Sequence, residues 1–177
     1  MRPILLTALA LLAACAPPAP PASPPPAAPT EAGPLAAQLA AATAAIGRWS
    51  YRSDEGVSSA CFGAPESECQ FSIQCEAPTQ TLTLIVDAEL TPDQDALIQI
   101  YDAQGSMTLF SRSHNEGLPS VIAEIGPDSL DRLGLLELLS TAPPRFAVET
   151  RALNGPAGDL VDYPWDDSIT RVLTACR

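Results

Sequence analysis

A proline-rich segment near the N-terminus sets the limit of the folded part of this chain. Nine of the nineteen residues from Ala16 to Pro34 are proline, most of the others are alanine, and only Glu31 is charged. Such a segment cannot form a core and favours the polyproline II conformation, giving a semi-rigid tether of up to roughly 60 Å at about 3.1 Å per residue. The remaining residues, 35–177, have the usual size of one domain with its own core.

The residues before the tether have the pattern of an exported protein. Arg2 is followed by an apolar run from Ile4 to Leu12, two alanines and Cys15. The run is shorter than the roughly 17 to 25 residues of a membrane-spanning helix. A charged start, a short apolar run and small residues are typical of a secretory signal peptide. We therefore expect residues 1–14 to be a signal peptide and Cys15 to begin the mature chain.

The four residues Leu12-Ala13-Ala14-Cys15 resemble the lipobox of bacterial lipoproteins. The resemblance implies that Cys15 is acylated on sulfur, becomes N-terminal by signal cleavage and is acylated again on its amine. Two or more acyl chains anchor a protein stably to a membrane. Many Gram-negative lipoproteins with an Asp directly after this Cys stay at the inner membrane. Ala16 in that position implies the periplasmic face of the outer membrane, with the outer face of the inner membrane as the alternative.

From Trp49 onward, apolar and polar residues alternate with a period of two, which is typical of half-buried strands. Phe71, Ile73 and Cys75 form the first clear run of this kind. Further strand candidates, separated by turn signals, lie at 82–86, 96–101, 106–112, 121–125 and 145–150. Many short strands with short connections indicate a mainly β domain, in which an antiparallel meander closes into a sandwich or barrel.

Three segments have helical periodicity instead. A short N-terminal helix is expected between Pro34, which favours a first helical turn, and Gly47, with Leu35, Leu39, Ala42 and Ile46 on its apolar face. A second helix is expected near 128–139, which is rich in leucine. The third, 165–176, has an apolar face of Trp165, Ile169, Val172, Leu173 and Cys176. Acidic residues at its start and arginines towards its end complement the helix dipole.

Four cysteines follow the tether: Cys61, Cys69, Cys75 and Cys176. In an exported chain an even number indicates disulfides, and four cysteines allow three connectivities. Cys61 and Cys69 flank a turn-rich loop between two strand candidates, so they can face each other across a hairpin, which leaves Cys75 for Cys176. The second bond would join the 71–75 strand to the C-terminal helix. The spacing does not favour a metal or redox site, because the chain has no Cys-x-x-Cys pair.

Residues spread over most of the domain carry a second resemblance. They are Trp49, Phe62-Gly63-Ala64-Pro65, Phe71-Ser72-Ile73-Gln74-Cys75, Arg145-Phe146-Ala147-Val148-Glu149, Pro164-Trp165, Arg171-Val172 and Cys176-Arg177. Together they resemble a small, functionally uncharacterised family of exported domains from high-GC Gram-negative bacteria. The resemblance implies a Cys75–Cys176 bond, makes the Cys61–Cys69 bond peculiar to this chain, and brings no known activity.

The charge of the chain excludes two classes of partner. It contains 21 acidic residues, nine arginines and no lysine, for a formal net charge of −12. An acidic chain without a basic cluster is repelled by phosphate backbones and by anionic lipid headgroups. We therefore expect no nucleic-acid partner, and membrane contact only through the lipid anchor.

The sequence gives little sign of catalysis or of a cofactor. The single histidine, His114, follows Ser113 between two strand candidates, and adjacent side chains cannot easily form the hydrogen bond of a nucleophile and its base. The chain also lacks the Gly-x-Ser-x-Gly motif of many hydrolases. We expect no enzyme activity and no cofactor, and keep a hydrolase as the minor alternative.

One acidic run is a weak metal candidate. Asp159, Asp162, Asp166 and Asp167 offer oxygen ligands of the kind that Ca²⁺ prefers. Their spacing fits no EF-hand loop, and two of them lie at the expected start of the C-terminal helix, where acidic residues complement the dipole. A solvated acidic face is therefore the preferred interpretation.

These observations favour a membrane-anchored periplasmic lipoprotein that acts as a non-catalytic accessory or protein-interaction module of the cell envelope, with an envelope protein as its partner. The alternatives are a small-ligand or Ca²⁺ binding domain and a protein similar to periplasmic lysozyme inhibitors. Those inhibitors present an acidic surface to a basic enzyme, but their Ser-Gly-x-x-Tyr loop is missing from this chain.

Overall fold

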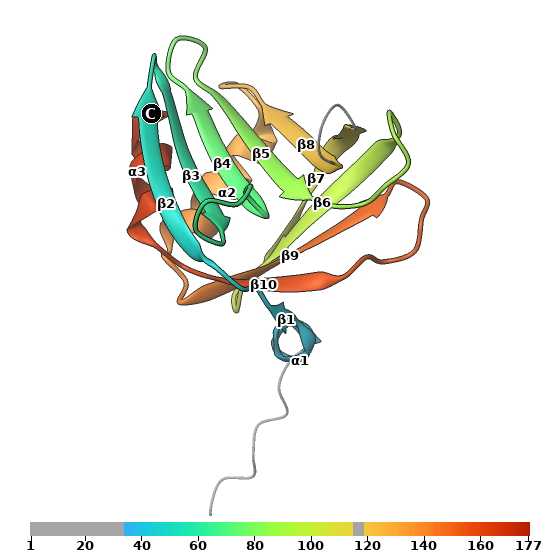
Figure 1. Cartoon of the computed structure of the whole chain (residues 1–177). Helices are drawn as coiled ribbons and strands as arrows, with labels where there is room; N and C mark the ends of the chain where they lie inside the picture. Colours follow the sequence, from blue (N-terminus) through green and yellow to red (C-terminus); the bar gives the residue numbers. More distant parts are fainter. Residues whose placement is uncertain (1–33, 115–118) are drawn as a thin grey trace, which may run out of the picture. The chain divides into compact units, whose positions relative to one another are not determined.

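The computed structural model describes residues 34–114 and 119–177 (Figure 1). The expected signal peptide, Cys15 and all but the last residue of the expected tether fall at 1–33, outside the described residues. Within the described ranges, no helix has the length and apolar character needed to cross a membrane.

Ten strands form one curled, mixed sheet in the order β1-β10-β9-β6-β7-β8-β5-β4-β3-β2. All neighbours are antiparallel except β1 and β10, which are parallel. The strands are β1 (Thr43–Ala44), β2 (Arg48–Asp54), β3 (Val57–Gly63), β4 (Phe71–Glu76), β5 (Thr81–Asp87), β6 (Asp95–Tyr101), β7 (Ser106–His114), β8 (Ser120–Ile125), β9 (Arg145–Ala152) and β10 (Leu160–Pro164). The mainly β, barrel-like fold expected from the sequence is confirmed.

The strand order adds detail to the expected meander. Strands β2 to β5 are consecutive neighbours, but β8 rather than β6 lies beside β5, and β9 lies beside β6. Strands β7 and β8 pair only over Arg112–His114 and Ser120–Ile122. Beyond this short ladder the sheet bends, so that its two halves face each other across the core (Figure 1).

Three helices complete the domain, as expected: α1 (Pro34–Ala41), α2 (Leu130–Ser140) and α3 (Asp167–Ala175). The helices α2 and α3 contribute Leu135, Leu139, Ile169, Val172 and Leu173 to the same core as the inward side chains of the strands. They therefore fill the concave side of the sheet. The helix α1 instead packs Leu39 against Tyr101 and Ala147, on the opposite face of β6 and β9.

The boundaries of two helices differ from the expected ones. The helix α1 ends at Ala41 rather than near Gly47, because Thr43 and Ala44 pair with β10, and Ile46 is 82% exposed instead of lying on a helix face. The helix α3 begins after Asp166, whose carboxylate accepts a hydrogen bond from the Ser168 backbone N–H at 2.8 Å. Such a cap satisfies a backbone donor that has no partner inside the helix.

An aromatic cluster joins β2, at one edge of the sheet, to β10, next to the other edge. Trp49, on β2, packs against Phe71 with ring centroids 6.0 Å apart, and Phe71 packs against Tyr163, on β10, at 5.2 Å. The indole N–H of Trp49 donates a hydrogen bond to the backbone carbonyl of Pro164 at 2.7 Å. Burial raises the pKa of Tyr163 to about 12, so its phenol stays neutral in the core.

Two disulfides connect elements within the domain. Cys61 is bonded to Cys69 across the loop between β3 and β4, and Cys75, on β4, is bonded to Cys176 at the end of α3. These are the pairs expected from the sequence. Disulfides persist in oxidising compartments, so the domain belongs to an extracellular or periplasmic environment.

The end of α3 is also held by a buried arginine. Arg132, on α2, is 6% exposed and donates hydrogen bonds to the backbone carbonyls of Gln80 and Cys176. Within the described residues its guanidinium has no carboxylate partner. Because carbonyl groups at a helix C-terminus carry partial negative charge, the end of α3 stabilises this buried cation.

We predict that the two disulfides contribute unequally to the free energy of unfolding. In the chain-entropy model, a bond that spans 101 residues contributes about 4.7 kcal/mol and one that spans eight residues about 2.6 kcal/mol. The double variant C75A/C176A should therefore lose more stability than C61A/C69A in denaturant titrations under non-reducing conditions. An equal or larger loss in C61A/C69A would contradict this order.

Candidate functional site

The strand β2 lies at one edge of the sheet and pairs only with β3. The two strands are joined by a two-residue turn, Glu55-Gly56, in which both residues have positive φ, at 47° and 85°. This is the geometry of a type I′ turn, in which the flanking residues, Asp54 and Val57, form a hydrogen-bonded pair.

The pairing register shows which backbone groups of β2 are left open. Hydrogen-bonded pairs recur at every second residue, so the peptide groups of Tyr51 and Ser53 point away from β3. No other backbone in the described part of the chain bonds to them. At the other end of the strand, the Trp49 indole N–H donates a hydrogen bond to the Pro164 carbonyl, which ties this end to β10. The open stretch of the edge is therefore Ser50–Asp54.

A groove lies beside this open stretch. Its volume is about 630 Å³, and it is lined by Tyr51 from β2 and by Asp167, Thr170, Arg171, Thr174 and Ala175 from α3. The Arg171 guanidinium lies 3.6 Å from the centroid of the Tyr51 ring. A guanidinium stacked on an aromatic ring keeps its N–H edge available for a carboxylate.

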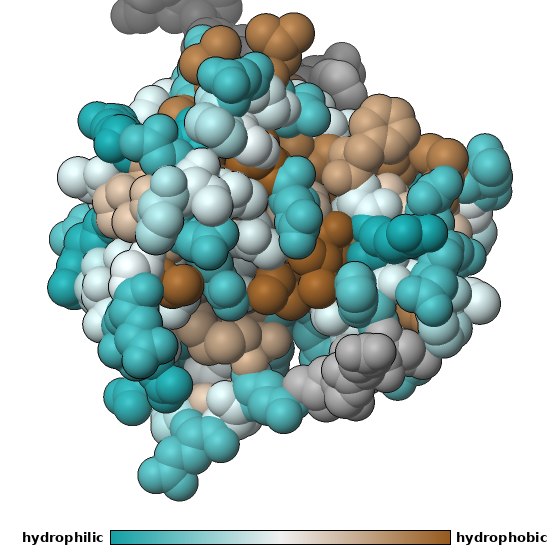
Figure 2. Space-filling model, turned by 90° about the horizontal axis from the view of Figure 1, so that it is seen from above, coloured by the Kyte–Doolittle hydropathy of each residue, from teal (hydrophilic) through white to brown (hydrophobic). Residues whose placement is uncertain are grey.

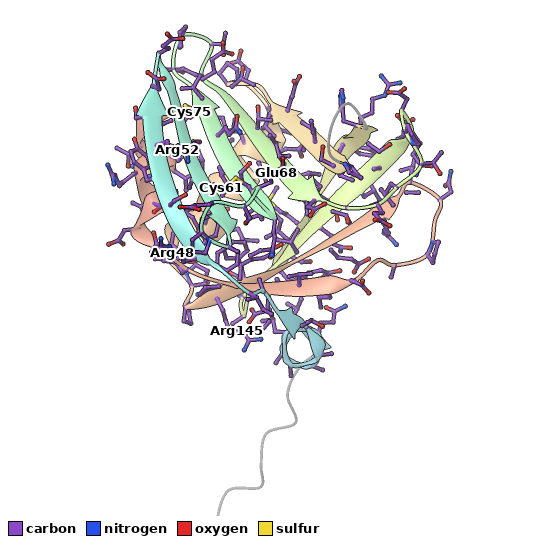
Figure 3. All side chains as sticks on the ribbon, viewed as in Figure 1. Arg48, Arg52, Cys61, Glu68, Cys75 and Arg145 are labelled. Atoms are coloured by element: carbon purple, nitrogen blue, oxygen red, sulfur yellow. A yellow bond between two sulfur atoms is a disulfide. The ribbon has the colours of Figure 1, made fainter. Side chains whose placement is uncertain are left out.

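Two more arginines lie on the other face of β2. Arg48 and Arg52 alternate with Trp49 and Tyr51 and are exposed (Figure 3). Among the described residues, neither they nor Arg171 form an ion pair or donate a side-chain hydrogen bond. Arg145 behaves differently, because its Nε lies 2.9 Å from a carboxylate oxygen of Asp162. The edge strand thus has Arg48 and Arg52 on one face and Arg171 of α3 over the other, and within the described residues none of the three forms an ion pair.

The phenol of Tyr51 belongs to a small network of hydroxyl groups. Its hydroxyl donates to the Ser58 hydroxyl at 3.3 Å, and that hydroxyl lies 3.3 Å from the hydroxyl of Ser53. Once the phenol is deprotonated, the hydroxyl of Ser58, and next that of Ser53, can donate to the phenolate, which lowers the pKa of Tyr51 below its ordinary value. The positive charge of Arg171 acts in the same direction.

Ser113 and His114, the residues considered for catalysis, are not arranged as a nucleophile and its base. The Ser113 hydroxyl is buried, accepts a hydrogen bond from the Gln94 backbone N–H at 3.0 Å and donates one to the Thr91 carbonyl at 2.6 Å. It therefore fixes the connection between β5 and β6. His114, at the end of β7, is exposed, and the alternation of a strand directs it away from the side that buries Ser113.

The four aspartates of the acidic run are not gathered into one ligand set. Asp159 is exposed in the connection before β10, Asp162 pairs with Arg145, and Asp166 caps α3, with Asp167 in its first turn. Within residues 34–114 and 119–177 no group of three or more His, Cys, Asp or Glu side chains is placed to hold a metal ion.

Other surface features offer less to a partner. A second groove, of about 370 Å³, lies between α2 and the β6–β7 turn, and its Asp102 carboxylate already accepts hydrogen bonds from the Gln104 and Gly105 backbones at 2.7 Å. Figure 2 shows hydrophobic side chains interspersed among hydrophilic ones on the face seen from above. The large apolar residues with the most exposure come from several elements: Ile46, Val57, Phe110, Leu130, Leu133 and Leu153.

The open edge of β2 was not found by sequence reasoning. The alternation Arg48-Trp49-Ser50-Tyr51-Arg52 identifies a strand with two arginines on one face. It carries no signal for Arg171, which lies more than a hundred residues away and reaches Tyr51 only through the packing of α3.

Comparison of the chain with models of protein families, with curated proteins and with solved structures finds no match.

We predict that Ser58 controls the titration of Tyr51 more than Arg171 does. Replacing Ser58 with Ala should raise the pKa of Tyr51 towards its ordinary value, because the largest stabilisation of the phenolate is lost. Arg171→Ala should raise it less. Ultraviolet absorbance titration, with Tyr51→Phe as the reference that identifies the signal, measures both shifts. A larger shift in Arg171→Ala would contradict the assignment.

Proposed function

We propose that this protein is a lipid-anchored accessory of the cell envelope that binds another envelope protein through its β domain. The anchor is Cys15 in the lipobox-like Leu12-Ala13-Ala14-Cys15, and the proline-rich segment carries the domain away from the membrane surface. Ala16 after the anchor favours the periplasmic face of the outer membrane. The disulfides support this address, because the periplasm is an oxidising compartment.

The observation that carries the binding role is the open edge of β2. An unpaired strand edge is a ready template for another chain, and proteins without a use for it cover it, shorten it or place charged side chains along it, which deter a strand of like charge. Here the edge is open over Ser50–Asp54, lies beside a groove and carries Arg48 and Arg52, which have no ion-pair partner within the described residues. The structural use of the Ser113 hydroxyl also favours binding over hydrolysis.

We predict that the mature protein carries three acyl chains on Cys15. Intact mass spectrometry of detergent-extracted protein should give the mass of residues 15–177 plus a diacylglyceryl group and one amide-linked acyl chain. The Cys15→Ala variant should keep residues 1–14 and lack the acyl mass, because it has no sulfur to modify. A wild-type protein that is cleaved but not acylated would contradict the anchor.

We predict that the full-length protein crosslinks to one envelope protein in intact cells. Because the chain has no lysine, amine-reactive reagents are unsuitable, and a photoreactive amino acid is introduced instead at Ser53 on β2, Phe110 on β7 or Leu133 on α2. All three side chains are exposed. Affinity purification and mass spectrometry should recover one partner in stoichiometric amount from at least one position. Failure to recover a specific partner from any of the three would contradict the proposed function.

A further inference from the structure

We propose that the open edge of β2 binds an extended, acidic peptide segment of the partner protein by strand addition. This inference rests on the proposed function and assigns it a site and a chemical class of ligand. In strand addition, main-chain hydrogen bonds contribute affinity, while pockets for alternate side chains contribute specificity.

The backbone of β2 provides the first requirement. The N–H and C=O groups of Tyr51 and Ser53 point away from β3 and bond to no other backbone among the described residues. The type I′ turn at Glu55-Gly56 ends the strand sharply and leaves the adjoining edge uncovered. An added strand can therefore form up to four main-chain hydrogen bonds at these two residues.

The groove provides the second requirement. Side chains of an added strand would alternate between the two faces of the sheet. Those on the concave face would enter the groove beside Tyr51 and α3. Its wall includes the hydroxyl groups of Thr170 and Thr174, the stacked guanidinium of Arg171 and, one turn earlier on α3, the carboxylate of Asp167. Those on the convex face would lie beside the exposed side chains of Arg48 and Arg52.

The charges identify the chemistry of the ligand. Both faces of an added strand would meet arginine, and a planar guanidinium binds a carboxylate through two parallel hydrogen bonds. Two acidic residues belong to the same site, because Asp54 ends the open stretch and Asp167 lines the groove. The acidic side chains of a bound peptide would therefore lie beside the arginines and away from these two positions. A peptide with acidic side chains at alternate positions therefore complements the edge.

A second copy of the chain is the competing occupant, because strands at open edges also pair with themselves. Two copies would each bring a net charge of −12, and the repulsion between them opposes association. The arginines at β2 would instead attract a separate acidic segment, so we assign the edge to a partner peptide.

The test begins with a library of random twelve-residue peptides displayed on phage and selected against the mature full-length protein in detergent. We expect the selected peptides to share acidic residues at alternate positions. One of them is then synthesised with a fluorescent label, together with a version that is N-methylated on the backbone at every second residue. Fluorescence anisotropy should show that methylation on one edge abolishes binding, because a methylated amide cannot donate to the open carbonyls of Tyr51 and Ser53.

Matched charge reversals locate the site. Arg52→Glu and Arg171→Glu should each weaken peptide binding roughly tenfold or more, through the loss of attraction and the gain of repulsion. Arg112→Glu makes the same charge change on an exposed residue of β7, which is separated from β2 by four other strands of the sheet, and should change binding less than twofold. Ser53→Pro, which removes one open N–H at a strand edge where proline is tolerated, should weaken binding as well. Circular dichroism of each variant identifies any that fail to fold.

Several results would overturn the inference. These are the recovery of no binding peptides, selected peptides without acidic residues, equal effects of Arg112→Glu and Arg52→Glu, and dimerisation in sedimentation experiments that Ser53→Pro abolishes. A partner that crosslinks from Phe110 or Leu133 but not from Ser53 would leave the proposed function standing and refute only this site.

Discussion

The arrangement of the domain depends on the attachment of its C-terminal helix to the concave side of the sheet. Ile169, Val172 and Leu173 are buried there, and the bond between Cys75 and Cys176 fixes the end of α3 to the strand β4. Because an open sheet with one apolar face must cover that face, the position of this helix determines how the sheet can curl. Arg132 adds a polar contact between α2 and the same helix end.

The attachment of α3 also creates the candidate site. The residues of the groove belong to one strand and one helix that are far apart in the sequence, and only the packing of α3 brings Arg171 over Tyr51. The same packing leaves the peptide groups on the outer side of β2 uncovered. Stability and binding capacity therefore have a common origin, since the bond that holds the helix also holds one wall of the groove.

Much of the fold could be predicted from the sequence, because the inward residues of most strands are apolar and alternate with polar ones. The strand β4 is an example: Phe71, Ile73 and Cys75 are all fully buried. The strands β1 and β10 were missed, and β2 had no expected range of its own. In β10, Asp162 and Pro164 resemble turn residues, whereas Asp162 is stabilised by Arg145 and Pro164 ends the strand. Pairing partners of this kind are set by tertiary structure and leave no local signal.

The candidate site was less predictable for the same reason. Alternation identifies β2 as a strand, but whether its second edge is covered depends on which strand lies beside it in the finished sheet. The sequence gives no indication that Arg132 is buried. In α2 the usual pattern is reversed, because the charged Arg132 is buried while the apolar Leu130 and Leu133 are exposed. Its carbonyl partners, from Gln80 and Cys176, lie far apart in the sequence.

The placement of α1 and β1 has a mechanical consequence. The helix has eight residues, and Leu39 is its one fully packed side chain, while β1 contributes a ladder of only two residues. Both disulfides lie further along the chain. A pulling force applied at the N-terminus would therefore detach α1 and β1 first. The detachment would stop near Trp49, whose indole is bonded to Pro164. Detachment of residues 34–47 would extend the reach of the domain by roughly 45 Å, at about 3.3 Å per residue, while the crosslinked sheet remains folded.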